Sequence, residues 1–89
     1  MEIIVRKLSD EEKQQLGIAK WPVWTKEISI FDWYYDAPEE CYLLEGEVEV
    51  TTRNGEKVSF GVGDFVSFPQ GLKCTWCVKK PVRKHYRLT

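Results

Sequence analysis

Histidine and cysteine, two residue types that often catalyse reactions or bind metals, are scarce in this sequence. One histidine, His85, occurs among 89 residues, which excludes multi-histidine metal sites and leaves one candidate for a histidine-based triad. Cysteine occurs three times, and an odd number does not favour a disulfide framework. The chain holds four tryptophans, four tyrosines and 30% charged residues. These types favour a site built from aromatic rings, carboxylates and amines.

The charged residues are balanced in number but unevenly distributed. Thirteen Lys and Arg against 14 Asp and Glu give a net charge of −1, and no overall positive field for nucleic acid. Residues 27–52 hold eight acids and no Lys or Arg, whereas residues 79–89 hold five basic residues and no acid. We interpret this pattern as charge complementarity between neighbouring strands, or as solvated edges. An anion site for a carboxylate or phosphate on the basic segment is the alternative.

Periodicity predicts one small all-β domain over residues 1–89, with one short helix near the N-terminus. The capping box Ser9-Asp10-Glu11-Glu12 and the helix stop at Gly17 predict a helix over residues 10–16. An edge strand is expected over residues 2–5. From Trp24 onward, apolar residues alternate with polar ones, and Asn54-Gly55 suits a hairpin turn. Strands are expected within residues 25–35 and over 47–50, 57–60, 64–68, 73–78 and 83–88, an antiparallel barrel over about residues 24–88.

The N-terminal residues and the composition also bear on where the protein acts. No apolar run has the length of a signal peptide or of a membrane span. The cysteines fit a reducing compartment. We therefore expect a cytoplasmic protein that binds neither nucleic acid nor membranes.

Residues 63–74 resemble the second motif of the cupin superfamily. That motif has a Gly, five residues, Pro-x-Gly, two residues and then usually a metal-binding His. Gly63, Pro69 and Gly71 match it, and Cys74 stands at the histidine position.

The first cupin motif, His-x-His followed by a Glu and a later Gly, aligns on Gly46 and places Glu39 at the glutamate. The two histidine positions then fall on Trp33 and Tyr35. Over about residues 30–80 the chain looks most like small single-domain cupins of unknown function, related to ureidoglycine aminohydrolase-like and ethanolamine-utilisation cupins. The resemblance implies a jelly-roll barrel. Because three of the four customary metal ligands are replaced, we expect no metal or other cofactor.

The motif alignment and strand alternation together predict which side chains face the barrel lumen. The predicted ligand-binding residues are Trp33, Tyr35, Cys41, Trp76, Lys84 and Tyr86, and the candidate catalytic groups are Glu39 and Cys74. Glu39 is the best general acid–base candidate, because a carboxylate inside a barrel is costly to bury unless it is paired.

Each of these interpretations has a structural alternative. The large aromatics could simply fill a small barrel, and Cys74 could be a small buried apolar residue. Glu39 could be a rim carboxylate, solvated or paired with a lysine. His85 is expected on the outer face, in solvent.

The sequence therefore predicts a small-molecule-binding cupin. The resemblance suggests a nitrogenous or carboxylate-bearing metabolite as ligand, and whether the protein acts on it as a metal-independent enzyme stays open. Two alternatives remain: a divalent-metal enzyme using Glu39, Cys74 and the Tyr35 hydroxyl, or a non-catalytic assembly module. The assembly module would be a homodimer formed through exposed strands such as residues 47–50.

Overall fold

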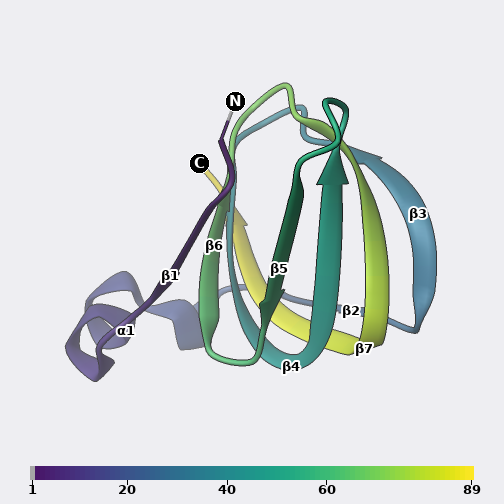
Figure 1. Ribbon diagram of the computed structural model, residues 1–89. Helices are drawn as coiled ribbons and strands as arrows, with labels where there is room; N and C mark the ends of the chain where they lie inside the picture. Colours follow the sequence, from purple (N-terminus) through teal and green to yellow (C-terminus); the bar gives the residue numbers. More distant parts are fainter. Residues whose placement is uncertain (1) are drawn as a thin grey trace.

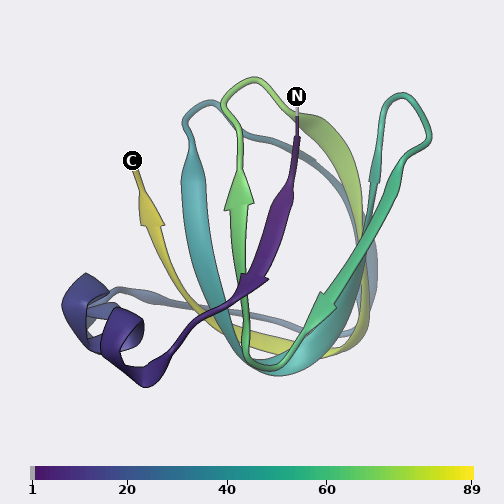
Figure 2. The same ribbon diagram turned by 60° about the vertical axis from the view of Figure 1, so that its left-hand side comes forward.

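Two long antiparallel strands, β4 (Glu39–Thr52) and β7 (Lys73–Leu88), run through the whole barrel and hold its other strands (Figure 1). The structure is a computed structural model that describes residues 2–89. One half of the barrel has the strand order β1 (Ile4–Lys7), β6 (Asp64–Phe68), β4, β7 and β2 (Val23–Lys26). In the other half, β5 (Lys57–Gly61) pairs with β4, and β3 (Ser29–Tyr34) pairs with β7. Figure 2 shows the sheet curling round to form the barrel. The predicted antiparallel cupin-type barrel is confirmed.

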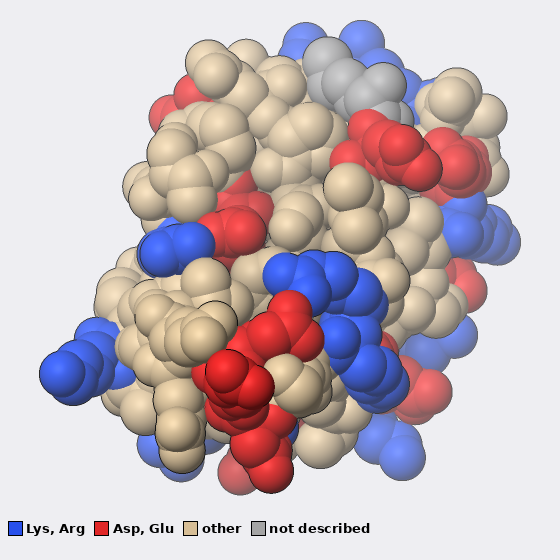
Figure 3. All heavy atoms as spheres, turned by 90° about the vertical axis from the view of Figure 1, so that its left-hand side faces the viewer, with Lys and Arg blue, Asp and Glu red and all other residues tan. Residues whose placement is uncertain are grey.

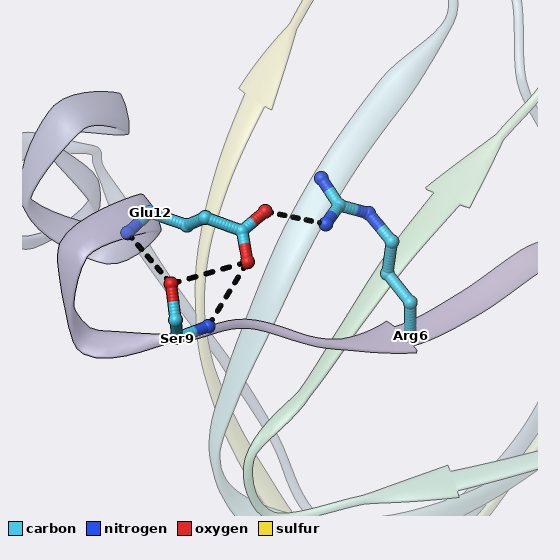
Figure 4. Close-up of polar contacts among 3 residues, drawn as sticks. All are labelled: Arg6, Ser9 and Glu12. Atoms are coloured by element: carbon cyan, nitrogen blue, oxygen red, sulfur yellow. Dashed lines mark hydrogen bonds and ion pairs between the residues drawn. The ribbon is translucent and has the colours of Figure 1, made fainter.

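The helical segment lies at one side of the barrel and is fixed by local hydrogen bonds. Helix α1 (Asp10–Leu16) has the predicted bounds, and the 3-10 helix η1 (Ile18–Lys20) follows it. The Ser9 hydroxyl accepts a hydrogen bond from the Glu12 backbone N–H, and the Glu12 carboxylate accepts one from the Ser9 backbone N–H (Figure 4). Arg6 donates to the same carboxylate at 2.9 Å, which joins β1 to the helix. Among the described residues, no helix is long and apolar enough to cross a membrane.

The two long strands bend together at Gly46, where the chain passes from one half of the barrel to the other. The β4–β7 register shifts between Leu43 and Val48, as in a β-bulge. Gly46 has a φ of 109°, and a Cβ atom there would lie 2.7 Å from the Pro81 carbonyl oxygen. Since Pro81 lies within this irregular stretch, it interrupts no ladder pairing, and the strands predicted over 73–78 and 83–88 are one strand.

Alternate residues of β4 form the centre of the core. Glu39, Cys41 and Leu43 are buried before the bend, and Val48 and Val50 after it. Residues 47–51 pair with β5 on one side and with β7 on the other, so they offer no free edge. A homodimer through residues 47–50 therefore cannot form by pairing at a free strand edge.

Ion pairs link the acidic β4 to the basic β7. Lys79 lies 3.7 Å from Glu49, Lys84 lies 2.9 Å from Glu39, and Arg87 lies 2.7 Å from Glu40. The interpretation of the uneven charge as complementarity between neighbouring strands is confirmed. On the face that carries α1, acidic and basic side chains also lie next to one another (Figure 3).

Candidate functional site

A cavity of about 240 Å³ lies between β2, β3, β7 and the loop that joins β3 to β4. Most of its wall is aromatic, and two charged side chains from β4 and β7 reach it from the barrel interior. The lining residues are Trp24, Phe31, Trp33, Tyr34, Tyr35, Asp36, Ala37, Glu39, Trp76, Lys84, Tyr86 and Leu88.

The two charged side chains that line the cavity from the interior form a buried ion pair. Lys84 Nζ donates to Glu39 Oε2 at 2.9 Å, and the two residues are only 5% and 8% exposed. Lys84 is the register partner of Leu43, on the inward face of the sheet, so its long side chain extends along the interior to Glu39. The adjacent Glu40 faces outward and pairs with Arg87 instead. The motif spacing therefore identified the inward-facing glutamate correctly.

Two tryptophan rings enclose the Lys84 ammonium group. Its Nζ lies 4.9 Å from the ring centroid of Trp24 and 4.8 Å from that of Trp76. These distances fit cation–π interactions, which stabilise an ammonium group away from water. The only hydrogen bond that Lys84 makes to a described side chain is the one to Glu39, although an ammonium group has three donors.

Tyr35 also lines the cavity, and its hydroxyl group is hydrogen-bonded in the interior. The hydroxyl accepts a hydrogen bond from Trp76 Nε1 at 3.2 Å, and the ring stacks on Phe68 with centroids 4.5 Å apart. Burial, and then the Glu39 carboxylate, raise the pKa of Tyr35, so the hydroxyl keeps its proton. Since the indole uses a lone pair of the oxygen, the hydroxyl proton can be donated to a ligand.

The mouth of the cavity is apolar and exposed. Trp33 is 45% exposed and lies edge-on to Phe31, with Tyr34 and Leu88 also exposed at the opening. Trp33 therefore does not fill the barrel, whereas Trp76 is 2% exposed and packs against Phe60 and Phe68 in the interior. Aromatic side chains therefore do fill the interior of the barrel, as expected, and the cavity lies on the other side of Trp76 from Phe60 and Phe68.

The structure separates the cysteines from the cavity. Cys41 is fully buried beneath it, and burial raises the pKa of its thiol to about 12. Cys74 lies against the Trp33 carbonyl with Sγ at 3.8 Å from the oxygen, and burial, together with Asp32, raises the pKa of its thiol to about 11. Neither thiol lines the cavity with Glu39. A thiol with a raised pKa is a poor nucleophile at neutral pH.

The spacing of Cys74 and Cys77 is Cys-x-x-Cys, which the sequence interpretation above did not use. In redox proteins this spacing brings two thiols together. Here both residues lie on β7, where positions three apart point to opposite faces, and all three cysteines are free. The spacing therefore does not bring the two thiols together in this fold.

The donors present do not fit a divalent metal. Among residues 2–89, no three His, Cys, Asp or Glu side chains lie close enough together to hold one. Of the alternative set of Glu39, Cys74 and Tyr35, the glutamate is paired with Lys84, the thiol lies against a carbonyl, and the hydroxyl accepts an indole N–H. The alternative of a divalent-metal site made by these three residues is not supported.

His85 lies on the outer face, as alternation predicts, but it is half-buried rather than solvated. Its Nδ1 lies 2.9 Å from the Trp21 carbonyl oxygen, which requires that Nδ1 carries the proton. The helical segment covers this face of β7, and sequence periodicity gave no signal for that covering.

Sequence reasoning missed Trp24 and Phe31, which form much of the cavity wall. Trp24 is the register partner of Lys84, and Phe31 that of Trp76, so both side chains lie beside predicted site residues. The alternation in β2 and β3 was the available signal. It could not be used without knowing where these strands pair along β7.

Comparison with known proteins shows which family this chain resembles. The family model described as "EutQ-like cupin domain" matches residues 13–86. A DUF861 family protein from Thermotoga maritima is 53% identical, covers 99% of this chain and 100% of its own, and has a TM-score of 0.98. The Clostridium difficile EutQ protein is 22% identical, with 94% of this chain and 64% of that chain covered and a TM-score of 0.67, which shows the fold alone. No curated protein matches.

Proposed function

Because the chain belongs to the EutQ-like cupin family, we propose that it is a small-molecule-binding cupin domain whose ligand occupies the cavity between β2, β3 and β7. The ligand packs against the aromatic wall and directs a polar group to Glu39 and Lys84. A volume of about 240 Å³ lies just below the usual range for pockets of drug-sized ligands, about 300–1,000 Å³, which favours a small ligand built on one ring.

The buried pair of Glu39 and Lys84 is the observation that carries this proposal. A buried ion pair contributes little net stability compared with apolar side chains of similar volume, because both charges lose their hydration. Stability alone therefore does not account for a pair at these positions. The pair presents a carboxylate and an ammonium group to a cavity with apolar walls, and a few convergent polar groups in an apolar pocket are typical of ligand sites.

The exposed mouth supports the same proposal. Trp33, Tyr34 and Leu88 are each about half exposed or more, and all three border the cavity. Apolar side chains gathered at one opening mark a surface that a partner molecule covers.

The four tryptophans provide the test. Trp24, Trp33 and Trp76 line the cavity, whereas Trp21 packs elsewhere, against Phe65 and Arg87. In a screen of neutral and charged one-ring fragments, we expect binders that shift the indole N–H NMR signals of the first three and leave that of Trp21 in place. A screen in which no fragment moves those three signals, or in which every fragment moves all four alike, would refute the proposal.

Two adjacent glutamates give a matched pair of variants for the same measurement. Glu39→Gln removes a charge at the cavity, and Glu40→Gln removes the same charge from the outward-facing pair with Arg87. We expect fragment binding to weaken about ten-fold in the first variant, because a hydrogen bond to a charged group is lost, and to stay unchanged in the second. Equal affinities in the two variants would place the ligand elsewhere.

The proposal extends to the setting of the protein. Three free cysteines suit a reducing cytoplasm. If the protein forms a homodimer, which sedimentation velocity would detect, β3 and β5 offer strand edges for it, since each pairs with one neighbour in the described residues.

A further inference from the structure

We propose that the ligand is an uncharged planar ring with an amide edge, that is, an N–H donor beside a carbonyl acceptor; this inference rests on the proposed function. Three features of the site support it: the hydrogen-bonding capacity that Glu39 and Lys84 retain, the charge of the pair, and the aromatic wall of the cavity.

Glu39 and Lys84 each have hydrogen-bonding capacity left after pairing with each other. The pair uses Lys84 Nζ and Glu39 Oε2, which leaves further N–H donors on the ammonium group. No hydrogen bond from the described residues reaches Glu39 Oε1. The described residues hold no fully buried side-chain oxygen without a partner, so Oε1 keeps some accessible surface. Because both residues line the cavity and are paired at 2.9 Å, they bring an acceptor and a donor close together there. An amide edge, whose N–H and C=O also lie side by side, complements both.

The charges of the pair disfavour an ionic ligand. Glu39 and Lys84 neutralise each other at 2.9 Å, so a carboxylate bound to Lys84 meets the Glu39 carboxylate, and an amine bound to Glu39 meets the ammonium group. Asp36 at the exposed rim adds a further negative charge against an anion. A charged ligand loses its hydration without gaining a free countercharge. A zwitterion meets both groups but loses the hydration of two charges.

The cavity wall fits a flat ring. Trp24, Phe31 and Trp33 line it with aromatic surface, on which a planar heterocycle can stack or pack edge-on. The Tyr35 hydroxyl, which keeps its proton, offers a second donor to a ring carbonyl or ring nitrogen. A saturated or branched molecule of the same volume would lose the contacts with the flat aromatic wall.

Two nearly identical compounds test the amide edge. 2-Pyridone carries one N–H beside one carbonyl on a planar ring, and N-methyl-2-pyridone replaces that N–H by a methyl group. We expect 2-pyridone to bind at least about ten-fold more tightly, measured by titrating the indole N–H signals of Trp24, Trp33 and Trp76, because the methyl compound leaves Glu39 without its donor. Benzoate, benzylamine and phenylalanine, an anion, a cation and a zwitterion, are expected to bind more weakly than 2-pyridone.

A double variant separates the polar contacts from the aromatic wall. Glu39→Met with Lys84→Met removes both charges together, so no unpaired charge stays buried and the barrel keeps its fold. In this variant, 2-pyridone and its methyl derivative are expected to bind with about equal affinity. Equal binding of the two compounds to the unaltered protein, or tighter binding of one of the charged compounds, would overturn the amide edge and leave the proposed function standing. Failure of every compound to shift the three cavity signals would overturn both.

Discussion

Removing one member of the Glu39–Lys84 pair is expected to destabilise the protein far more than removing a member of the neighbouring Glu40–Arg87 pair. The two pairs join the same strands, and their hydrogen bonds have nearly equal lengths of 2.9 and 2.8 Å. They differ in burial: the side chains of Lys84 and Glu39 are 6% and 10% exposed, against 39% and 25% for Arg87 and Glu40.

The loss of unfolding free energy depends on whether the charge that stays in the protein is buried or exposed. Breaking a buried ion pair from one side costs about 3–5 kcal/mol, whereas an exposed pair contributes about 0–1 kcal/mol. Lys84→Met is expected at the upper end, because it leaves the Glu39 carboxylate unpaired and also removes the contacts of the ammonium group with Trp24 and Trp76. Glu39→Gln is expected to cost about 3 kcal/mol, since the two rings still stabilise the ammonium group. Glu40→Gln is expected to cost under about 1 kcal/mol.

Urea unfolding followed by tryptophan fluorescence measures these free energies. The Glu39→Met, Lys84→Met double variant is expected to recover much of the loss, because it leaves no charge unpaired in the interior. If Glu39→Gln cost no more than Glu40→Gln, the interior of the barrel would be hydrated enough to solvate the ammonium group. Burial of the Glu39–Lys84 pair would then give no support to a ligand site.

Four further predictions concern the fold, the thiols and the helix cap. Gly46→Ala is expected to cost more than about 3 kcal/mol of unfolding free energy in urea, because its Cβ would lie 2.7 Å from the Pro81 oxygen at positive φ. Gly55→Ala, whose Cβ meets nothing within 4 Å, carries only the cost of positive φ, about 1–2 kcal/mol. Iodoacetamide at pH 8 is expected to alkylate half-buried Cys77 before Cys41 and Cys74, as peptide mass mapping would show, since burial raises the pKa of the latter two thiols to about 12 and about 11. Because the folded protein holds the Cys41 thiol proton more tightly than the unfolded chain does, the free energy of unfolding is expected to be constant below pH 9.0, the unfolded thiol pKa, and to fall as the pH rises towards 12. Cys41→Val is expected to remove part of this fall. Ser9→Ala is expected to speed hydrogen exchange of the Glu12 amide roughly five-fold and leave that of Val50 unchanged, because the cap is lost and α1 buries none of its own residues.

Local signals in the sequence predicted the parts of the fold that local interactions determine. Helix α1 has the predicted bounds because Ser9, Glu12 and Gly17 satisfy its terminal backbone groups within the segment itself. The inward position of Glu39 followed from motif spacing and strand alternation. The sequence predicts two strands over 73–78 and 83–88, whereas β7 is one strand: Pro81 is accepted within it because the register with the partner strand is irregular near Gly46.

The cavity could be predicted only in part, because its walls depend on pairing between distant segments. Trp24 reaches Lys84 through the β2–β7 register, and Phe31 reaches Trp76 through the β3–β7 register. Local periodicity does not determine which residues of two strands pair. A slip of one residue would turn every side chain of a strand to the opposite face of the sheet. For the same reason, Cys74 shares an interior with Glu39 in the sequence alignment but lies outside the cavity in the fold.

The replacement of the usual cupin ligands explains why a lysine lies where it does. Trp33, Tyr35 and Cys74 stand at three positions that hold metal-binding histidines in the motif, and all three are uncharged here, with the pKa of Tyr35 and that of Cys74 raised. The fourth position, Glu39, keeps a carboxylate inside the barrel, and a buried carboxylate requires a countercharge. Lys84 supplies it from within the chain. An ammonium group differs from a metal ion in what it offers a ligand, because it donates hydrogen bonds and has no coordination site for an oxygen or nitrogen lone pair. The substitution therefore changes the predicted ligand from one that coordinates a metal to one that complements a donor and an acceptor, as an amide edge does.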